Sequence, residues 1–170
     1  MLALGLAVAA LVALADQASK LWVLRYFGEA ECVNHLLPVS SFFDFVLTCN
    51  RGVSFGFFNH PGQPELGFWI FSVLATLIVI GLLVWLYRVR SAFLAVAIGL
   101  VIGGAVGNVI DRLRLGAVVD FLYFHAGAWY WPAFNLADSA ICLGVGAIVL
   151  DGLLLRRAAP QAKGKEDLSR

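Results

Sequence analysis

Long apolar runs dominate the pattern of hydrophobic and polar positions along the chain. Each run is close to the roughly 20 residues with which a helix crosses the hydrocarbon core of a bilayer. Four membrane-spanning helices are predicted, at about residues 1–24, 67–87, 92–111 and 134–155. Because no internal repeat or linker separates them, they indicate one membrane-embedded domain over residues 1–157.

The first run also has features of a secretory leader, because its short apolar stretch ends in Ala13-Leu14-Ala15. A leader begins with a positively charged segment, however, and none precedes this run. The apolar pattern resumes at Leu21-Trp22-Val23-Leu24, after the polar Asp16 and Lys20. We therefore interpret residues 1–24 as one helix with a polar patch rather than as a cleaved leader.

Residues 41–58 have a pattern typical of strands. Ser41–Thr48 and Val53–Phe58 are rich in β-branched and aromatic residues, and Asn50-Arg51-Gly52 between them has the composition of a turn. This pattern predicts a hairpin, with a further strand at residues 117–124. Strands at a membrane surface must pair to satisfy their backbone groups, so one small sheet is expected at the outer interface, where aromatic rings are favoured.

Composition agrees with a membrane location. The chain is 61% hydrophobic and 14% charged, with a mean hydropathy of +0.88, whereas about 25% of the residues in a soluble domain are charged. The net charge of +1 gives no indication of a nucleic-acid partner. The expected fold class is therefore an α-helical membrane protein with four transmembrane helices and a small periplasmic β-sheet on its outer face.

The positive charges predict the orientation of these helices. Arg88 and Arg90 crowd the link between the second and third helices, and Arg156 and Arg157 follow the fourth. The positive-inside rule puts both regions in the cytoplasm. Both termini are then cytoplasmic and the strands lie outside. Residues 158–170 are polar and lack an apolar period, so a disordered tail is expected there.

The cysteines and histidines do not form a recognisable metal motif. Cys32, Cys49 and Cys142 lack metal-ligand spacing, and the three histidines lack the His-Glu-x-x-His pattern. No metal or cofactor is predicted. Cys32 and Cys49 both fall in the outer segment, where an oxidising compartment permits a disulfide. Free, partly buried thiols are the alternative.

Polar side chains from separate parts of the chain gather near the external leaflet. They are Asp16, Lys20, Asn50, Asn108, Asp111, Arg112, Asp120, Asn135 and Asp138. The inner half of the predicted bundle is almost purely apolar. This one-sided distribution predicts a functional site at the outer end.

Several of these residues have simple structural explanations. Asp16 and Lys20 are four apart on one helix face and can pair. Arg112 can extend to the interface or hold Asp111. Asn135 is well placed to cap the start of the fourth helix.

Asp120 and Asp138 are harder to explain, because neither has a basic residue three or four positions away. An ionised side chain at membrane depth costs about 3 kcal/mol on insertion scales, which makes an intramembrane acid a candidate functional group. Two carboxylates held close in a low-dielectric site share a proton. The ionised member can take a proton from water while the protonated member polarises a carbonyl, as in an aspartic protease.

The chain also resembles the bacterial lipoprotein signal peptidases, or signal peptidase II family. The resemblance lies in five blocks in the family's order, Asp16–Lys20, Asn50–Phe55, Gly103–Arg112, Val118–Phe121 and Phe134–Ser139. It covers essentially the whole chain except the tail. Arg51 and Val53 depart from the family pattern, in which threonine and alanine are common at these places.

The resemblance implies an inner-membrane aspartic endopeptidase that cuts prolipoproteins just before a diacylglyceryl-modified cysteine. The implied catalytic pair is Asp120 and Asp138. The implied substrate-binding or supporting residues are Asn50, Gly52, Asn108, Arg112 and Asn135, and the implied structural polar residues are Asp16, Lys20 and Asp111. The expected partners are these lipid-modified substrates and membrane lipid, and the expected oligomeric state is a monomer.

Three other functions remain open from the residues alone. Lys20 with Ser54 is a conceivable serine-lysine dyad, although Asp16 already offers Lys20 a partner. Intramembrane acids also occur in proton-coupled transporters, but the apolar inner half provides no pathway. A packing subunit is the third, because Gly99, Gly103 and Gly107 form a smooth stripe. We expect this stripe to meet the complementary small residues of the fourth helix, which are Ala137, Ala140, Gly144 and Ala147.

Overall fold

The protein consists of four long helices and one antiparallel sheet in a computed structural model, which describes residues 1–28, 34–51 and 64–158. The helices are α1 (Leu2–Tyr26), α2 (Pro64–Arg88), α3 (Ala92–Leu115) and α4 (Leu136–Ala158). The strands are β1 (His35–Pro38), β2 (Phe43–Asn50), β3 (Val118–Ala126) and β4 (Trp129–Tyr130). All four helices are long and apolar enough to cross a membrane, which confirms the predicted fold class.

Each helix continues past the C-terminal end that was predicted for it. α1 continues without a break through its polar patch as far as Tyr26. α3 continues to Leu115 rather than 111, and it ends because Gly116 adopts the left-handed conformation (φ 70°) and donates its N–H to the Arg112 carbonyl at 2.9 Å. α4 continues to Ala158, and the predicted disordered tail otherwise lies outside the described residues.

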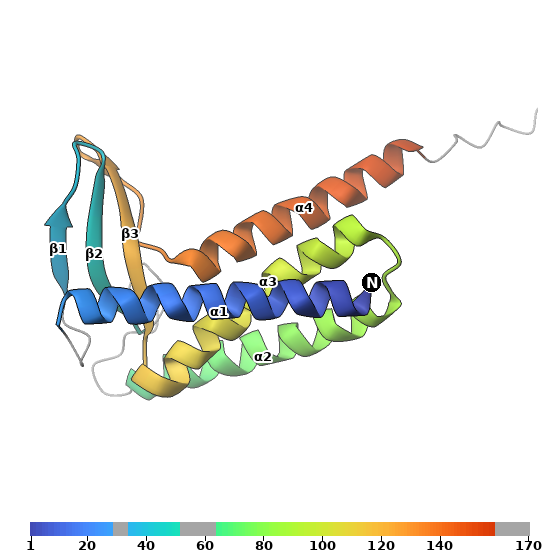
Figure 1. Ribbon diagram of the computed structural model, residues 1–170, viewed down its shortest axis with the longest axis horizontal. Coiled ribbons are helices and arrows are strands. Elements are labelled where there is room, and N and C mark those ends of the chain that lie inside the picture. The colour runs from blue at the N-terminus through green and yellow to red at the C-terminus, as the bar shows by residue number, and fades with distance from the viewer. Residues whose placement is uncertain (29–33, 52–63, 159–170) are drawn as a thin grey trace, which may run out of the picture.

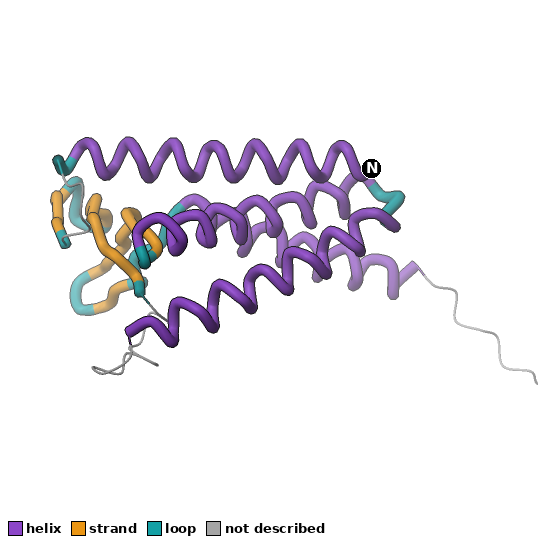
Figure 2. The backbone as a smooth tube through the Cα atoms, turned by 90° about the horizontal axis from the view of Figure 1, so that it is seen from below, coloured by secondary structure: helices purple, strands orange, loops and turns teal. Residues whose placement is uncertain are grey.

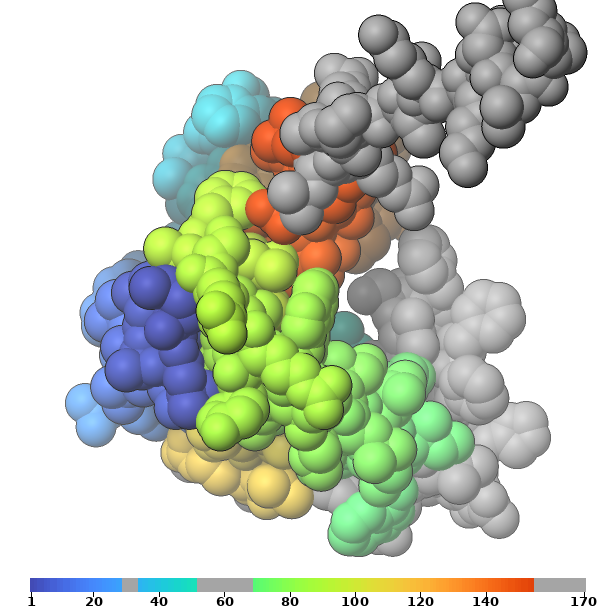
Figure 3. All heavy atoms as spheres, turned by 90° about the vertical axis from the view of Figure 1, so that its right-hand side faces the viewer, coloured from blue at the N-terminus to red at the C-terminus, as the bar shows by residue number. Residues whose placement is uncertain are grey.

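The sheet covers one end of the helix bundle (Figures 1 and 2). The opposite end carries the N-terminus, the link between α2 and α3, and the last turn of α4 (Figure 1). Figure 3 views this opposite end directly, with the blue start of α1 beside the yellow-green link. The Ser91 hydroxyl caps the start of α3 here, because it accepts a hydrogen bond from the Leu94 N–H at 3.3 Å. The polar sheet end and the link end therefore lie at opposite limits of the bundle.

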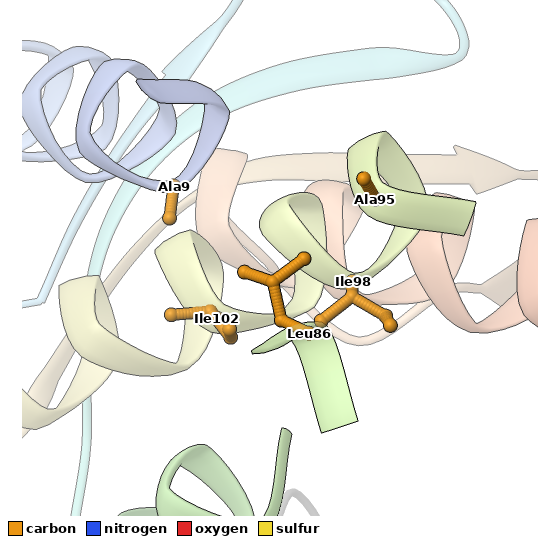
Figure 4. Packing of buried hydrophobic residues seen from close by; sticks show 5 residues of the cluster. All are labelled: Ala9, Leu86, Ala95, Ile98 and Ile102. Atoms are coloured by element: carbon orange, nitrogen blue, oxygen red, sulfur yellow. The ribbon is translucent and has the colours of Figure 1, made fainter. Parts of the chain in front are cut away.

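α3 is the central helix of the bundle and packs against α1, α2 and α4. In its most apolar 18-residue stretch 56% of the residues are buried, against 17% or less in each other helix. The three helices around it, α1, α2 and α4, instead expose large apolar side chains, as expected where a helix faces lipid. Near the link end, Leu86 of α2 packs between Ile98 and Ile102 of α3 (Figure 4).

The glycine stripe of α3 packs against α1 rather than α4. A Cβ on Gly103 would lie 2.6 Å from the Ala9 carbonyl oxygen of α1, so only glycine permits this approach. The predicted contact between the stripe and α4 is therefore wrong. α4 meets another face of α3, where Gly104 lies against the Ala137 carbonyl, because the small residues of α3 cover more than one side of the helix.

The sheet has the order β1-β2-β3-β4, and each neighbouring pair is antiparallel. β1 and β3 occupy both edges of β2 between Asp44 and Leu47. The predicted hairpin between residues 41–48 and 53–58 is therefore wrong in its pairing, and residues 52–58 lie outside the described part of the chain. The predicted strand at 117–124 is present as β3.

A short return of the chain connects the sheet to α4. After β4, Phe134 pairs with Leu122 of β3, and the two residues exchange backbone hydrogen bonds of 2.9 and 3.0 Å. α4 begins two residues later, at Leu136. This pairing holds the start of α4 beside Asp120, which lies near the start of β3.

Candidate active site

Polar side chains from five elements meet where the sheet joins the helix bundle. They are Asp16 and Lys20 of α1, Asn50 of β2, Asn108, Asp111 and Arg112 of α3, Asp120 of β3, and Asn135 and Asp138 at the start of α4. Most of them are buried. Gly52, the remaining predicted site residue, lies outside the described residues.

Asp120 is held in β3 with 2% of its surface exposed. Side chains alternate along a strand, so its neighbours Val119 and Phe121 face a buried apolar cluster on the other side of the sheet. Asn135 donates its Nδ2–H to Asp120 Oδ1 at 2.7 Å, and Asn50 donates its Nδ2–H to Oδ2 at 3.2 Å. Both oxygens of this carboxyl group are therefore fixed by amide donors.

Asp138 is fixed by the way in which α4 begins. Asn135 Oδ1 accepts the Asp138 N–H at 2.9 Å, which confirms the predicted N-cap. Asp138 Oδ2 in turn accepts the Asn135 N–H at 3.3 Å, and this reciprocal pair has the form of a capping box. Asp138 Oδ1 accepts a hydrogen bond from Asn108 Nδ2 of α3 at 2.8 Å.

Two asparagine amides connect the two acids. Asn135 Nδ2, which binds Asp120, lies 3.3 Å from Asn108 Oδ1, and Asn108 Nδ2 binds Asp138. Asp120, Asn135, Asn108 and Asp138 thus form one continuous hydrogen-bonded chain. The structure brings the two predicted acids into a single site.

The environment of Asp120 favours its protonated form. Burial is the largest cause, and the negative charge of Asp138 is the next, and together they raise the pKa of Asp120 to about 7. Hydrogen bonds from Asn50 and Asn135 and the positive charge of Lys20 oppose this rise in pKa. A carboxyl group near half protonation at neutral pH can donate or accept a proton.

The charge of Arg112 interacts more strongly with the two acids than with Asp111. Its Nη1–H donates to the Asn108 carbonyl at 3.3 Å, and its guanidinium lies 6.0 Å from the ring centre of Phe71. Of the carboxylates around it, Asp138 and then Asp120 interact most strongly with its charge. The predicted alternative in which Arg112 holds Asp111 is wrong, because Lys20 takes that carboxylate.

Lys20 is the centre of a second buried group. Its Nζ lies 2.8 Å from Asp16 Oδ2, 2.8 Å from Asp111 Oδ2 and 3.0 Å from Asn108 Oδ1. The predicted Asp16–Lys20 pair is therefore present, with Asp111 as a further member. Gly107 of α3 makes room for the Asp16 carboxylate, since a Cβ at this position would collide with Asp16 Oδ2.

One residue of this region was not predicted. Gln17 donates its Nε2–H to Asp111 Oδ1 at 2.8 Å, and its Oε1 accepts from Arg114 at 3.1 Å. Its place beside Asp16 was the available signal in the sequence. The sequence does not reveal that its amide reaches α3.

His125, the cysteines and Ser54 are the other groups that the sequence offers for chemistry. His125 pairs with Asp44 between β3 and β2, with Nε2 and Oδ2 3.1 Å apart. Among the described residues there is no cluster of three or more His, Cys, Asp or Glu side chains that could hold a metal ion. Cys49 is disulfide-bonded and Cys142 is free, while Cys32 and Ser54 are outside the described residues.

Comparison with known proteins gives consistent matches over most of the chain. The family model described as signal peptidase (SPase) II matches residues 8–154. A lipoprotein signal peptidase of Methylorubrum extorquens (strain PA1) is 49% identical over 147 residues, which cover 86% of this chain and 82% of that protein. Another, of Azoarcus sp. (strain BH72), is 47% identical over 159 residues, covering 92% and 86%. A solved bacterial membrane enzyme has a TM-score of 0.72 and 25% identity, covering 97% of this chain and 94% of its own.

Proposed function

Since this chain belongs to the signal peptidase II family, whose members are multi-pass membrane aspartic endopeptidases that process lipoproteins, we propose that Asp120 and Asp138 are its catalytic pair. The observation that carries the proposal is the hydrogen-bonded chain from Asp120 through Asn135 and Asn108 to Asp138. It holds two carboxyl groups in one site, and one of them has a raised pKa.

The two acids have different roles in this proposal. Asp138, which is the less buried of the two and accepts hydrogen bonds from Asn108 and Asn135, is the general base. Asp120 is the more buried, protonated member. Asp138 takes a proton from water, the resulting hydroxide attacks the scissile carbonyl carbon, and Asp120 gives its proton to the carbonyl oxygen.

Collapse of the tetrahedral intermediate restores the enzyme. The carbonyl re-forms, its hydroxyl proton returns to Asp120, and Asp138 gives its proton to the leaving amine as the C–N bond breaks. No covalent intermediate is needed. Asn50, Asn108, Arg112 and Asn135 are supporting residues, because each holds one of the acids or interacts with its charge.

This assignment predicts how cleavage depends on pH. Asp120 donates only while protonated, and its pKa is about 7. As the pH rises through 7, the protonated fraction in the free enzyme falls, so we expect kcat/KM to halve near pH 7 and to fall about tenfold per further pH unit. A pH–rate profile on purified enzyme measures this limb. A rate that instead rises through pH 7 would assign the proton to Asp138 and reverse the two roles.

We also propose the substrate and the bond that is cut. The substrate is a prolipoprotein whose cysteine bears diacylglycerol, and cleavage occurs just before that cysteine, as the family resemblance implies. A lipid on the cysteine would hold the scissile bond at the membrane surface. The site at the end of the bundle, where the helices meet the sheet, suits such a bond (Figure 1).

The direct test uses purified enzyme and one prolipoprotein in two forms, with and without diacylglycerol on its cysteine. We expect the modified form to be cut with a kcat/KM at least about 100-fold higher, and mass spectrometry to find the lipid-bearing cysteine at the new N-terminus. The loss of acyl-chain burial at about 0.8 kcal/mol per CH₂ accounts for a difference of this size. Equal cleavage of both forms, or cleavage elsewhere, would refute the proposed specificity.

The proposed location is the bacterial inner membrane, with both termini cytoplasmic and the site at the outer leaflet. Arg88 ends α2 and Arg90 lies in the link that follows, at the end opposite the sheet (Figure 1), and the positive-inside rule places such residues in the cytoplasm. At the sheet end Trp129, Tyr130 and Trp131 are exposed, and such rings favour the membrane interface. The enzyme is proposed to act as a monomer.

A further inference from the structure

The backbone immediately before each proposed catalytic acid is held by a carboxylate of the Lys20 group. The Val119 N–H, which precedes Asp120, donates to Asp111 Oδ2 at 3.1 Å. The Ala137 N–H, which precedes Asp138, donates to Asp16 Oδ1 at 3.0 Å. The same kind of contact therefore occurs twice, once on β3 and once in the first turn of α4.

Lys20 connects these two contacts. Its Nζ lies 2.8 Å from Asp16 Oδ2 and 2.8 Å from Asp111 Oδ2. Asp16, Lys20 and Asp111 are each at most 2% exposed, so water cannot substitute for one partner. One ammonium group thus fixes the two carboxylates that in turn hold β3 and α4.

Lys20 also determines which way the Asn108 amide points. Its Nζ donates to Asn108 Oδ1 at 3.0 Å, so the amide oxygen faces Lys20 and the NH₂ group faces Asp138. With the amide reversed, its NH₂ would meet the ammonium of Lys20 and its oxygen would meet a carboxylate. The donor that binds Asp138 is therefore kept in place from α1.

We propose that Asp16, Lys20 and Asp111 form a brace that sets the spacing and orientation of the two catalytic acids, through Val119 N–H, Ala137 N–H and the Asn108 amide. The proposal rests on the catalytic roles proposed above for Asp120 and Asp138. The brace residues touch neither substrate nor water in the reaction. They are positioning residues, and they act because a misplacement of about 1 Å at a reacting group can cost 100-fold in rate.

Charge balance alone is the competing explanation, and Asp111 offers a way to separate the two. Asp111→Asn removes the charge but keeps an oxygen where Oδ2 accepts from Val119 and Lys20. Its NH₂ then faces Gln17, whose partly exposed amide can rotate to present Oε1. Asp111→Glu keeps the charge but moves the acceptor outward by one methylene, which displaces Val119 or Lys20.

The experiment compares kcat and KM of Asp111→Asn and Asp111→Glu on a diacylglyceryl-modified prolipoprotein, each at its own optimal pH. If the three residues act as a brace, Asp111→Asn keeps kcat within about fivefold of the wild-type value. Asp111→Glu then lowers kcat at least about tenfold, while its KM stays within about twofold of wild type. The opposite result, in which Asp111→Glu has a near-wild-type kcat and Asp111→Asn is strongly impaired, would show that only charge balance matters and would overturn the proposal. A wild-type kcat in both variants would overturn it as well.

Controls separate a positioning effect from loss of fold. Ile98→Ala removes buried packing at the link end, away from the brace, and is expected to lower the Tm while kcat stays within twofold. If Asp111→Glu does not accumulate in membranes, Asp111→Ala replaces it, because it also lacks the acceptor for Val119. Asp120→Asn and Asp138→Asn are assayed in parallel. If these two variants still cleave, the proposed function fails, whereas a failure of the brace alone leaves them inactive.

Discussion

Asp120→Asn and Asp138→Asn each lower kcat at least about 1,000-fold, because an amide neither takes a proton from water nor gives one to a carbonyl, and such proton transfer contributes roughly 10²- to 10⁴-fold. Asparagine has the size and shape of aspartate and can still accept one hydrogen bond. Each variant should therefore insert and fold. Cleavage of a diacylglyceryl-modified prolipoprotein is the assay, and the Tm in detergent checks the fold.

Asp44→Asn is a matched control for these two substitutions. Asp44 is also a buried acid of the sheet, but it pairs with His125 rather than with the site. The same chemical change there should leave kcat within about twofold. More than about 1% residual cleavage in Asp120→Asn or Asp138→Asn would remove that residue from the catalytic pair.

Asn135→Ser is expected to lower kcat about 100-fold while preserving the start of α4. Serine caps a helix about as well as asparagine, but its hydroxyl cannot replace the amide that donates to Asp120 at 2.7 Å. Without that donor Asp120 loses its connection to Asn108 and its fixed orientation, and misplacement of a catalytic group by about 1 Å costs about this much. The pKa of Asp120 should also rise, because the Asn135 hydrogen bond lowers it, so the alkaline limb of the pH profile moves to higher pH.

Asn135→Ala provides the comparison, because it removes both the amide and the cap. We expect Asn135→Ala to have a kcat similar to that of Asn135→Ser but a lower Tm, since loss of a helix cap lowers the free energy of unfolding by about 1 kcal/mol. If Asn135→Ser kept the wild-type rate, Asn135 would be a helix cap and nothing more. Kinetics and thermal unfolding on the same preparations distinguish these outcomes.

Much of the fold could be predicted because its helices lie in continuous apolar segments of membrane-spanning length. The ends of the helices could not be predicted as well. α3 ends where Gly116 adopts a left-handed conformation, and several polar residues before it resembled a helix end. β1 was missed because it is four residues long, mostly exposed and closed by Pro38, so it lacks the alternation that reveals a strand.

The site was predicted where its contacts are local and missed where they are not. Asp16 and Lys20 are one helical turn apart, and Asn135 precedes an apolar helix, so both pairings follow from spacing. Asp111 pairs with Lys20 rather than with its neighbour Arg112, because the packing of α3 on α1 determines its partner. No spacing rule predicts that Asn108 of α3 donates to Asp138 of α4.

The residues that meet at the site enter the membrane at different stages of synthesis. Asp16 and Lys20 lie on the same helix, so the first span brings a counter-ion for its buried lysine into the bilayer before any later span exists. Without that partner the lysine would cost about 3 kcal/mol to insert. Asp111 joins Lys20 only when α3 is made, and Asp138 follows with α4. The ion pair of α1 is thus complete within the first span, whereas the full set of polar residues at the candidate site requires the last helix.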